Sequence, residues 1–400
     1  MSPLLWCRFR VAGAGVALGL GLTVPLASCL PPENRPEPAY FPPTPSSPPR
    51  RVRRLVTSGG ATALSRFTQH ELHEYQPVLS PDGRSVVFAQ TGQELGPYGD
   101  PQGPTVIASV DAATGARRVM WTPAQALSLS PTWLPDGSSL LYVSNRSGPA
   151  AVVRSLSASP NSGVSIIMDE NQAQRIGSPS VSPDGRRVVA QAYIGNAVSI
   201  VMLSLGTSEY AVLGEGHHPV FDPRGERIAF VRQVGAETQI YTMRASDGTD
   251  VVQLTQGEYA ADDPTFSPDG RWIAYTLNRG EGARGPARDR RNLFATRADG
   301  QGTLIQVTDG ESMVRHPHWG VDGAIYFSAN SHNGNYDIWK LRPTGELASL
   351  AVTPTVYPGA PSSVAPPSDA TSSPAPQTLT PVGEVFPVEP EAPVRRRGRR

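Results

Sequence analysis

The sequence predicts an all-β protein: a six-bladed β-propeller of four-stranded antiparallel blades, with non-globular segments at both ends. Three observations predict this fold. One hairpin motif occurs six times, its copies are spaced by the length of a propeller blade, and the composition is rich in turn residues. The 400 residues include 41 prolines and 39 glycines, a balance that suits short strands joined by many turns.

The hairpin motif is clearest at residues 264–276, which read Pro-Thr-Phe-Ser-Pro-Asp-Gly-Arg-Trp-Ile-Ala-Tyr-Thr. A short first strand precedes a Pro-Asp-Gly turn, in which proline presets φ and glycine takes a positive φ. The second strand follows and is rich in aromatic and β-branched residues. Each of the six copies ends its turn with a glycine: Gly83, Gly137, Gly185, Gly225, Gly270 and Gly323.

The spacing of these glycines indicates the architecture. Successive glycines are 54, 48, 40, 45 and 53 residues apart. Repeats of roughly 40 to 50 residues, each with about four short strands, are typical of propeller blades. A closed ring buries both faces of every blade and leaves only short edges exposed. The aspartate before the glycine in five copies is expected to be structural, because the turn favours Asp-Gly.

The repeated Ser-Pro-Asp-Gly hairpin resembles the repeat of the TolB-type β-propellers, the PD40 repeat, which is related to WD40. Asn333–Leu341 resembles the third strand of that repeat, and Val251–Gly257 and Thr303–Gly310 resemble its outer strand. The resemblance covers about residues 55–353. It implies a propeller whose channel mouth receives a partner lipoprotein. TolB also has an α/β domain before its propeller, whereas a proline-rich segment precedes the repeats here.

The N-terminus is predicted to be a lipoprotein signal peptide over residues 1–28. Arg8 and Arg10 precede an apolar run over residues 11–26, and Leu26-Ala-Ser-Cys29 matches a lipobox. Lipidation of Cys29 would anchor the chain in the membrane, and an ordinary cleaved signal is the alternative. By resemblance to enterobacterial lipoproteins, the non-acidic Leu30 after the cysteine implies that the protein is sorted to the outer membrane and faces the periplasm. Exposure on the cell surface is the alternative orientation.

The remaining boundaries follow from composition. Residues 29–54 form a proline-rich tether, residues 55–353 the propeller, and residues 354–400 a disordered tail rich in Pro, Ser and Ala with a basic end. Residues 61–69 resemble an outer strand that precedes the first hairpin, so they are favoured to close the ring. Residues 346–353 compete for that position. The arginine-rich segment 279–291 is interpreted as a solvated loop in the fifth blade.

Charge and cysteine content exclude several functions. Lys+Arg and Asp+Glu both number 35, so net charge gives no reason to expect nucleic-acid binding. The two cysteines, Cys7 and Cys29, leave the body without a disulfide framework or a cysteine metal site. No Gly-x-Ser-x-Gly elbow occurs, so we expect no enzyme activity, no cofactor and no metal. A metal or a pH-sensitive rim at His217, His218 and His316 is the alternative.

The predicted protein is therefore a lipid-anchored, monomeric propeller that binds a protein partner of the cell envelope at one mouth, and a second lipoprotein is one such partner. The alternatives are a lyase or hydrolase with a channel site, and an envelope scaffold without a single partner. The candidate partner-binding residues lie just before the proline that starts each hairpin. They are Glu74, Tyr75, Arg175, His217, His218, Asp262, Asp263, Arg315 and His316.

Overall fold

The structure is a computed structural model, and it describes residues 55–58, 61–92, 103–169, 174–207, 209–278, 290–301, 304–332 and 334–348. These residues all belong to the first of two compact units, and the second unit, Pro361–Arg400, lies outside them. The predicted signal peptide, lipidation site Cys29, tether and tail also lie outside the described residues. The described part of the chain contains no helix whose length and hydropathy would let it traverse a lipid bilayer.

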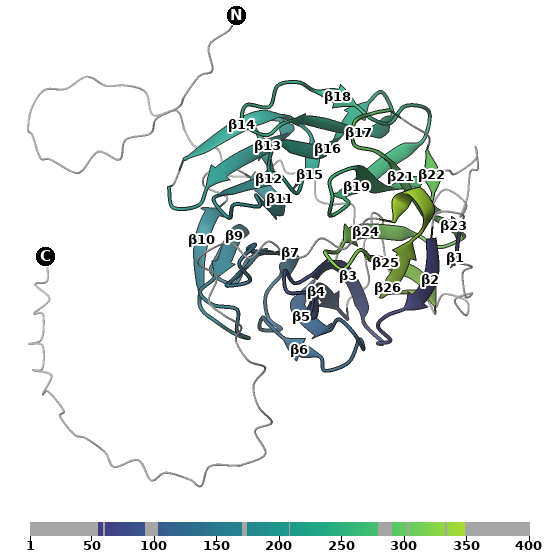
Figure 1. Ribbon diagram of the computed structural model, residues 1–400. Helices are drawn as coiled ribbons and strands as arrows, with labels where there is room; N and C mark the ends of the chain where they lie inside the picture. The colour runs from purple at the N-terminus through teal and green to yellow at the C-terminus, as the bar shows by residue number, and fades with distance from the viewer. Residues whose placement is uncertain are drawn as a thin grey trace, which may run out of the picture. The chain divides into compact units, whose positions relative to one another are not determined.

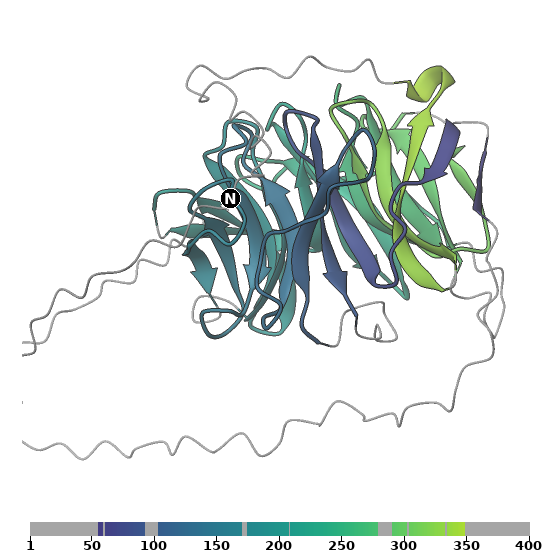
Figure 2. The same ribbon diagram turned by 90° about the horizontal axis from the view of Figure 1, so that it is seen from below.

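Six four-stranded antiparallel sheets form a ring of blades, as the motif spacing predicts (Figure 1). Figure 2 shows the ring edge-on, with the strands running across its thickness. The first strand of each blade faces the hub. These inner strands are β3 (His73–Leu79), β7 (Ser128–Trp133), β11 (Gln174–Val181), β15 (His217–Phe221), β19 (Ala260–Phe266) and β24 (Val314–Trp319).

The other strands follow outward in each blade. The second strands are β4 (Ser85–Thr91), β8 (Leu140–Ser144), β12 (Arg187–Ile194), β16 (Arg227–Val234), β20 (Trp272–Asn278) and β25 (Ile325–His332). The third strands are β5 (Val106–Asp111), β9 (Ala151–Ser155), β13 (Ala197–Ser204), β17 (Glu237–Arg244), β21 (Arg291–Arg297) and β26 (Asn335–Pro343). The outer strands are β6 (Val119–Met120), β10 (Val164–Asp169), β14 (Tyr210–Glu215), β18 (Val252–Gln253), β22 (Ile305–Gln306) and β2 (Ala61–Arg66).

The Pro-Asp-Gly turn has the structural role that the sequence predicts. In blade 5, Gly270 has φ +72°, a conformation that glycine adopts without steric cost. Asp269 accepts hydrogen bonds from the Ser267 hydroxyl (2.6 Å) and from the Arg271 backbone N–H (3.1 Å). The aspartate therefore holds the turn through side chain-to-backbone bonds, which is how Asp stabilises tight turns.

The N-terminal segment closes the ring, as the sequence favours. Strand β2 pairs with β26, the third strand of blade 6. Arg66 forms a two-pronged ion pair with the fully buried Asp337 (2.8 and 3.0 Å). The competing segment begins instead with a short 3₁₀ helix, Gly345–Leu347, whose Leu347 is buried in the core. Closure by the N-terminal strand β2 joins residues roughly 270 positions apart and fixes both ends of the ring.

A small additional sheet was not predicted. Strand β1 (Leu55–Thr57) pairs with β23 (Thr308–Gly310), the segment that links blades 5 and 6. Leu55 packs against the core cluster of these two blades. The chain thus contacts the ring at this seam before it enters the closing strand.

The apolar core lies between neighbouring blades. One cluster joins Val231 and Ile240 of blade 4 to Phe266, Ile273 and Tyr275 of blade 5, all of them buried. Aliphatic and aromatic side chains from facing sheets interdigitate in this way around the ring. Because the blades are fixed by these contacts, the inner strands present their side chains at constant positions around the hub.

Candidate functional site

Every inner strand contains a β-bulge at the same point of the repeat. The pairing register with the second strand shifts around the Xaa-Pro step in all six blades. The residue before the proline has a positive φ in each: Gln76 (56°), Ser130 (51°), Ser178 (46°), His218 (48°), Asp263 (53°) and His316 (50°). Proline lacks the N–H that a sheet ladder needs, and the bulge redirects the preceding side chain.

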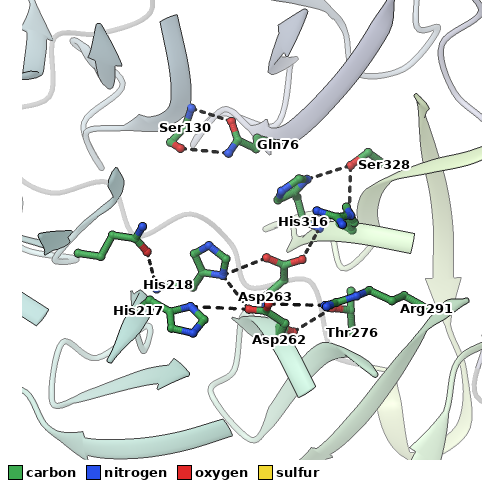
Figure 3. Close-up of polar contacts among 12 residues, drawn as sticks. Gln76, Ser130, His217, His218, Asp262, Asp263, Thr276, Arg291, His316 and Ser328 are labelled. Carbon is green, nitrogen blue, oxygen red and sulfur yellow. Dashed lines mark hydrogen bonds and ion pairs between the residues drawn. The ribbon is translucent and has the colours of Figure 1, made fainter. Parts of the chain in front are cut away.

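These bulged residues are linked from blade to blade around part of the hub (Figure 3). Gln76 of blade 1 accepts from the Ser130 backbone N–H (2.8 Å) and donates to its hydroxyl (3.1 Å). Asp263 of blade 5 accepts from the backbone N–H of His316 in blade 6 (3.1 Å). A non-glycine residue at positive φ costs about 1–3 kcal/mol, so these contacts hold a strained ring of side chains in place.

A charged cluster joins blades 4 and 5 at the hub. His218 Nδ1 lies 2.8 Å from Asp262 Oδ1 and 3.2 Å from Asp263 Oδ1. His217 Nδ1 lies 4.0 Å from Asp262 Oδ1, and the Arg291 guanidinium lies 3.5 Å from Asp262 Oδ2. Figure 3 shows these side chains converging from β15, β19 and β21. Between 11% and 32% of each side chain is exposed, so water and a ligand can reach the cluster.

The electrostatics assign a charge to each member. Burial alone would lower the pKa of His218, but Asp262 and Asp263 outweigh it and raise that pKa to about 9. Burial would raise the pKa of Asp262, but His218 and Arg291 hold it well below its ordinary range. Burial lowers the pKa of His217, and the charge of His218 lowers it further. At neutral pH the cluster therefore contains one imidazolium and one neutral imidazole.

His316, in blade 6, completes this side of the hub as a neutral group. Burial lowers its pKa to about 4, and the positive charges of Arg315 and His218 act in the same direction. Its Nδ1 lies 3.2 Å from the Ser328 hydroxyl. The three residues Ser328, His316 and Asp263 do not form a catalytic triad. Ser328 is fully buried. Asp263 accepts a hydrogen bond from the backbone N–H of His316, whereas the aspartate of a triad bonds the imidazole ring.

The structure corrects the predicted placement of Glu74 and Tyr75. Glu74 is 0% exposed and lies between blades 1 and 6, where it accepts from the Thr68 hydroxyl and pairs with Arg118 (2.5 Å). Burial raises its pKa, although Arg118 opposes the shift. Tyr75 is 2% exposed, and its ring lies 6.4 Å from that of His316. Neither side chain lies on an accessible rim.

The other predicted residues divide into two groups. His217, His218, Asp262, Asp263 and His316 come together in blades 4 to 6. Arg175 does not join them, because it is exposed in blade 3 with its guanidinium over the Tyr193 ring, 5.4 Å from the centroid. Arg315 is partly buried in blade 6 beside Met313, with Nε 3.1 Å from Sδ.

Sequence reasoning missed four residues of the hub. Gln76, Ser130 and Ser178 occupy the position immediately before the proline, so a strict register of the repeat would have found them. Arg291 was assigned to the loop 279–291, but it begins strand β21 and reaches Asp262. No local sequence signal separates Arg291 from the arginines before it, because its role depends on which strand it pairs with.

The fold and its hub define the class: a closed six-bladed propeller with a polar, partly exposed cluster on its inner strands. The family model for the TolB β-propeller domain (PD40) matches residues 155–370. The chain belongs to this TolB-like β-propeller family.

Individual relatives are distant. The chain is 25% identical over 234 residues to the uncharacterized peptidase YuxL of Bacillus subtilis, a match that spans 57% of this chain and 32% of that protein. It is 25% identical over 214 residues to the uncharacterized protein Atu1656 of Agrobacterium fabrum, spanning 51% of this chain and 66% of that protein. A solved structure assigned as TolB, from Agrobacterium tumefaciens, aligns with a TM-score of 0.51 at 16% identity. It covers 70% of this chain and 93% of that one, which shows the fold alone.

Proposed function

We propose that this protein is a non-catalytic binding module that presents the mouth of its propeller to a protein partner in the cell envelope. One observation carries the proposal. The bulged inner strands of blades 4 to 6 bring charged and neutral polar side chains into one partly exposed cluster. Interface centres combine such fixed charges with a rigid scaffold, and the blade-to-blade contacts hold this one in position.

The proposal includes a location. Lipidation of Cys29 would tether the ring to the outer membrane, facing the periplasm, where the partner would be another envelope protein, including a lipoprotein. The chain would act as a monomer. Radiolabelled palmitate should enter the wild-type protein and not Cys29→Ala, and the variant should leave the membrane fraction. Labelling of both proteins would contradict the anchor without affecting the binding proposal.

Crosslinking in living cells tests the binding proposal. A photoreactive amino acid placed at His217 or Arg175, both on inner strands, should give a discrete crosslinked protein, identified by mass spectrometry. The matched control is the same group at Val212, which is exposed on the outer strand β14. The partner should then bind the purified chain, and Asp263→Asn should weaken that binding. Identical crosslinks from all three positions, or none from the inner strands, would refute a partner at the mouth.

A hydrolase is the second candidate, because the relative YuxL is named as an uncharacterized peptidase. The match covers only 32% of that protein, and the contact between Ser328 and His316 at the hub has a fully buried hydroxyl. Peptide hydrolysis by the purified chain that disappears in His316→Gln would favour the hydrolase. Deletion of residues 354–400 distinguishes the binding module from a scaffold without a single partner. The binding module should keep its partner after the deletion.

A further inference from the structure

We infer that His217, His218 and Asp262 form a binding site for a divalent transition-metal ion of the zinc class. This inference goes beyond the proposed partner site and does not depend on it. One nitrogen from each histidine and one oxygen of Asp262 all lie within 4.8 Å of one another. The ligands come from two blades, so the ion would join β15 to β19.

The distances suit zinc coordination. Zinc binds imidazole nitrogen and carboxylate oxygen at about 2.0–2.2 Å in a tetrahedron, which places neighbouring ligand atoms about 3.3 Å apart. Asp262 Oδ1 lies 2.8 Å from His218 Nδ1 and 4.0 Å from His217 Nδ1. These separations bracket the required value, so small side-chain rotations suffice, and zinc binding would release the proton of the His218 imidazolium to solvent. Three protein ligands would leave one position for water or a partner group.

The bulge explains why both histidines face one carboxylate. Adjacent residues of a regular strand point to opposite faces of a sheet. His218 has φ +48°, and the register of β15 shifts between His217 and Val220. The two imidazole rings consequently lie edge-to-face with centroids 4.9 Å apart. The corresponding residue pairs of the other blades are Tyr75-Gln76, Leu129-Ser130, Gly177-Ser178, Asp262-Asp263 and Arg315-His316, and none of these pairs has two histidines.

The surroundings orient the carboxylate ligand. Arg291 lies 3.5 Å from Asp262 Oδ2, which leaves Oδ1 directed at the histidines. The Asp263 backbone N–H donates to the same Oδ1 at 2.9 Å. Hydrogen bonds and charges that fix a ligating carboxylate in this way are typical of metal sites. Asp263 adds a second negative charge 3.2 Å from His218, which offsets the positive charge of Arg291.

The ligand chemistry selects the ion. Imidazole nitrogen favours zinc and its neighbours in the first transition row, whereas calcium and magnesium prefer sites made wholly of oxygen. His316 lies outside this group of three ligands, and its Nδ1 contacts Ser328. The site thus differs from the three-histidine alternative that the sequence suggests.

Metal titration of the purified full-length protein in detergent tests the inference. After treatment with a chelator and dialysis, wild-type protein should bind one equivalent of Zn²⁺, measured against a chromophoric competitor at one fixed pH and by elemental analysis. Asp262→Asn and His217→Ala should each weaken binding at least tenfold. His70→Ala, which removes an exposed histidine outside the hub, is the matched control and should bind like wild type, as should His316→Gln.

A cobalt measurement keeps the outcome decisive. Co²⁺ should give the visible absorption of a tetrahedral nitrogen–oxygen site in wild type and lose it in His217→Ala. That variant removes a partly exposed side chain with a 4.0 Å contact to Asp262 and a ring contact to His218, so it should keep the fold even if Asp262→Asn does not. Substoichiometric zinc in wild type, or binding that persists in His217→Ala, would overturn the inference. Neither result requires the partner, so the binding proposal is judged separately.

Discussion

Replacing Arg118 by methionine should expose the energetic role of the buried carboxylate at the seam between blades 1 and 6. Glu74 is 0% exposed, and Arg118 Nη2 lies 2.5 Å from its Oε1. The variant loses the ion pair with Glu74 and leaves the carboxylate with the hydrogen bond from the Thr68 hydroxyl. Removing one partner of a buried ion pair costs about 3–5 kcal/mol. Because 24% of the Arg118 side chain is exposed, water can partly replace it. We therefore expect the variant to lower the free energy of unfolding by about 3 kcal/mol, at the lower end of this range.

A double-mutant cycle isolates the pair. Arg118 also lies over the Phe88 ring, 5.2 Å from its centroid, a contact worth about 0.5–1 kcal/mol that methionine loses as well. In a Glu74→Gln background, Arg118→Met should cost only this ring contact and the hydrogen bond that Arg118 donates to Gln90, together about 1–2 kcal/mol. The coupling between the two positions should therefore be about 1–2 kcal/mol at neutral pH, measured by guanidinium unfolding of all four proteins.

The pH dependence of the cycle has a defined sign. Burial raises the pKa of Glu74, and removal of Arg118 should raise it further. A carboxyl group with a raised folded-state pKa contributes stability that is complete below its ordinary pKa of 4.5 and is lost as pH rises through the folded value. The cost of Arg118→Met should therefore shrink on acidification. Equal costs in both backgrounds, or a cost that grows at low pH, would refute a buried ion pair at this seam.

Three further predictions test ring closure, a buried histidine and the bulges. Arg66→Ala should destabilise the ring by about 3 kcal/mol, since Asp337 is fully buried, whereas Arg66→Lys should restore part of that loss in thermal melts. Burial lowers the pKa of His318 to about 4, so protonation of this histidine favours the unfolded state and the protein loses stability as pH falls from about 6.5 towards 4. His318→Gln should flatten that part of the pH–stability curve. Gln76→Gly and Ser178→Gly both relieve the strain of a positive φ. Gln76→Gly also loses its hydrogen bond to blade 2, so denaturant unfolding should show this variant to be about 1 kcal/mol less stable than Ser178→Gly.

The architecture could be predicted because the sequence repeats its own turn chemistry. Each Pro-Asp-Gly turn fixes a hairpin locally, and the interval between turns fixes the number of strands per blade. Closure by residues 61–66 was also predictable, because an outer-strand pattern without a preceding hairpin has no other blade to join. Strand β1 was not predictable, since three residues, Leu55–Thr57, carry too little pattern to identify a pairing with β23.

The hub was predictable only in part. The repeat locates the residue before each proline, but the sequence does not indicate whether the side chain there faces water or a neighbouring blade. Glu74 lies two residues before Gln76 and is buried against Arg118, which is 44 positions further along the chain and donates to its carboxylate. Arg291 reaches Asp262 through strand pairing across blade 5. Both outcomes depend on long-range contacts, which local patterns do not encode.

The six blades of this ring differ at a few hub positions of an otherwise repeated unit. All six blades have the same strained step before a proline, so the bulge itself is architectural. What differs is the residue placed on it: amide and hydroxyl groups in blades 1 to 3, and imidazole and carboxylate groups in blades 4 to 6. Because the backbone geometry is constant, substitution there changes the chemistry of the hub without altering the turns or the core. The asymmetry between the two halves of the ring is thus the feature that a partner or an ion at the mouth would recognise.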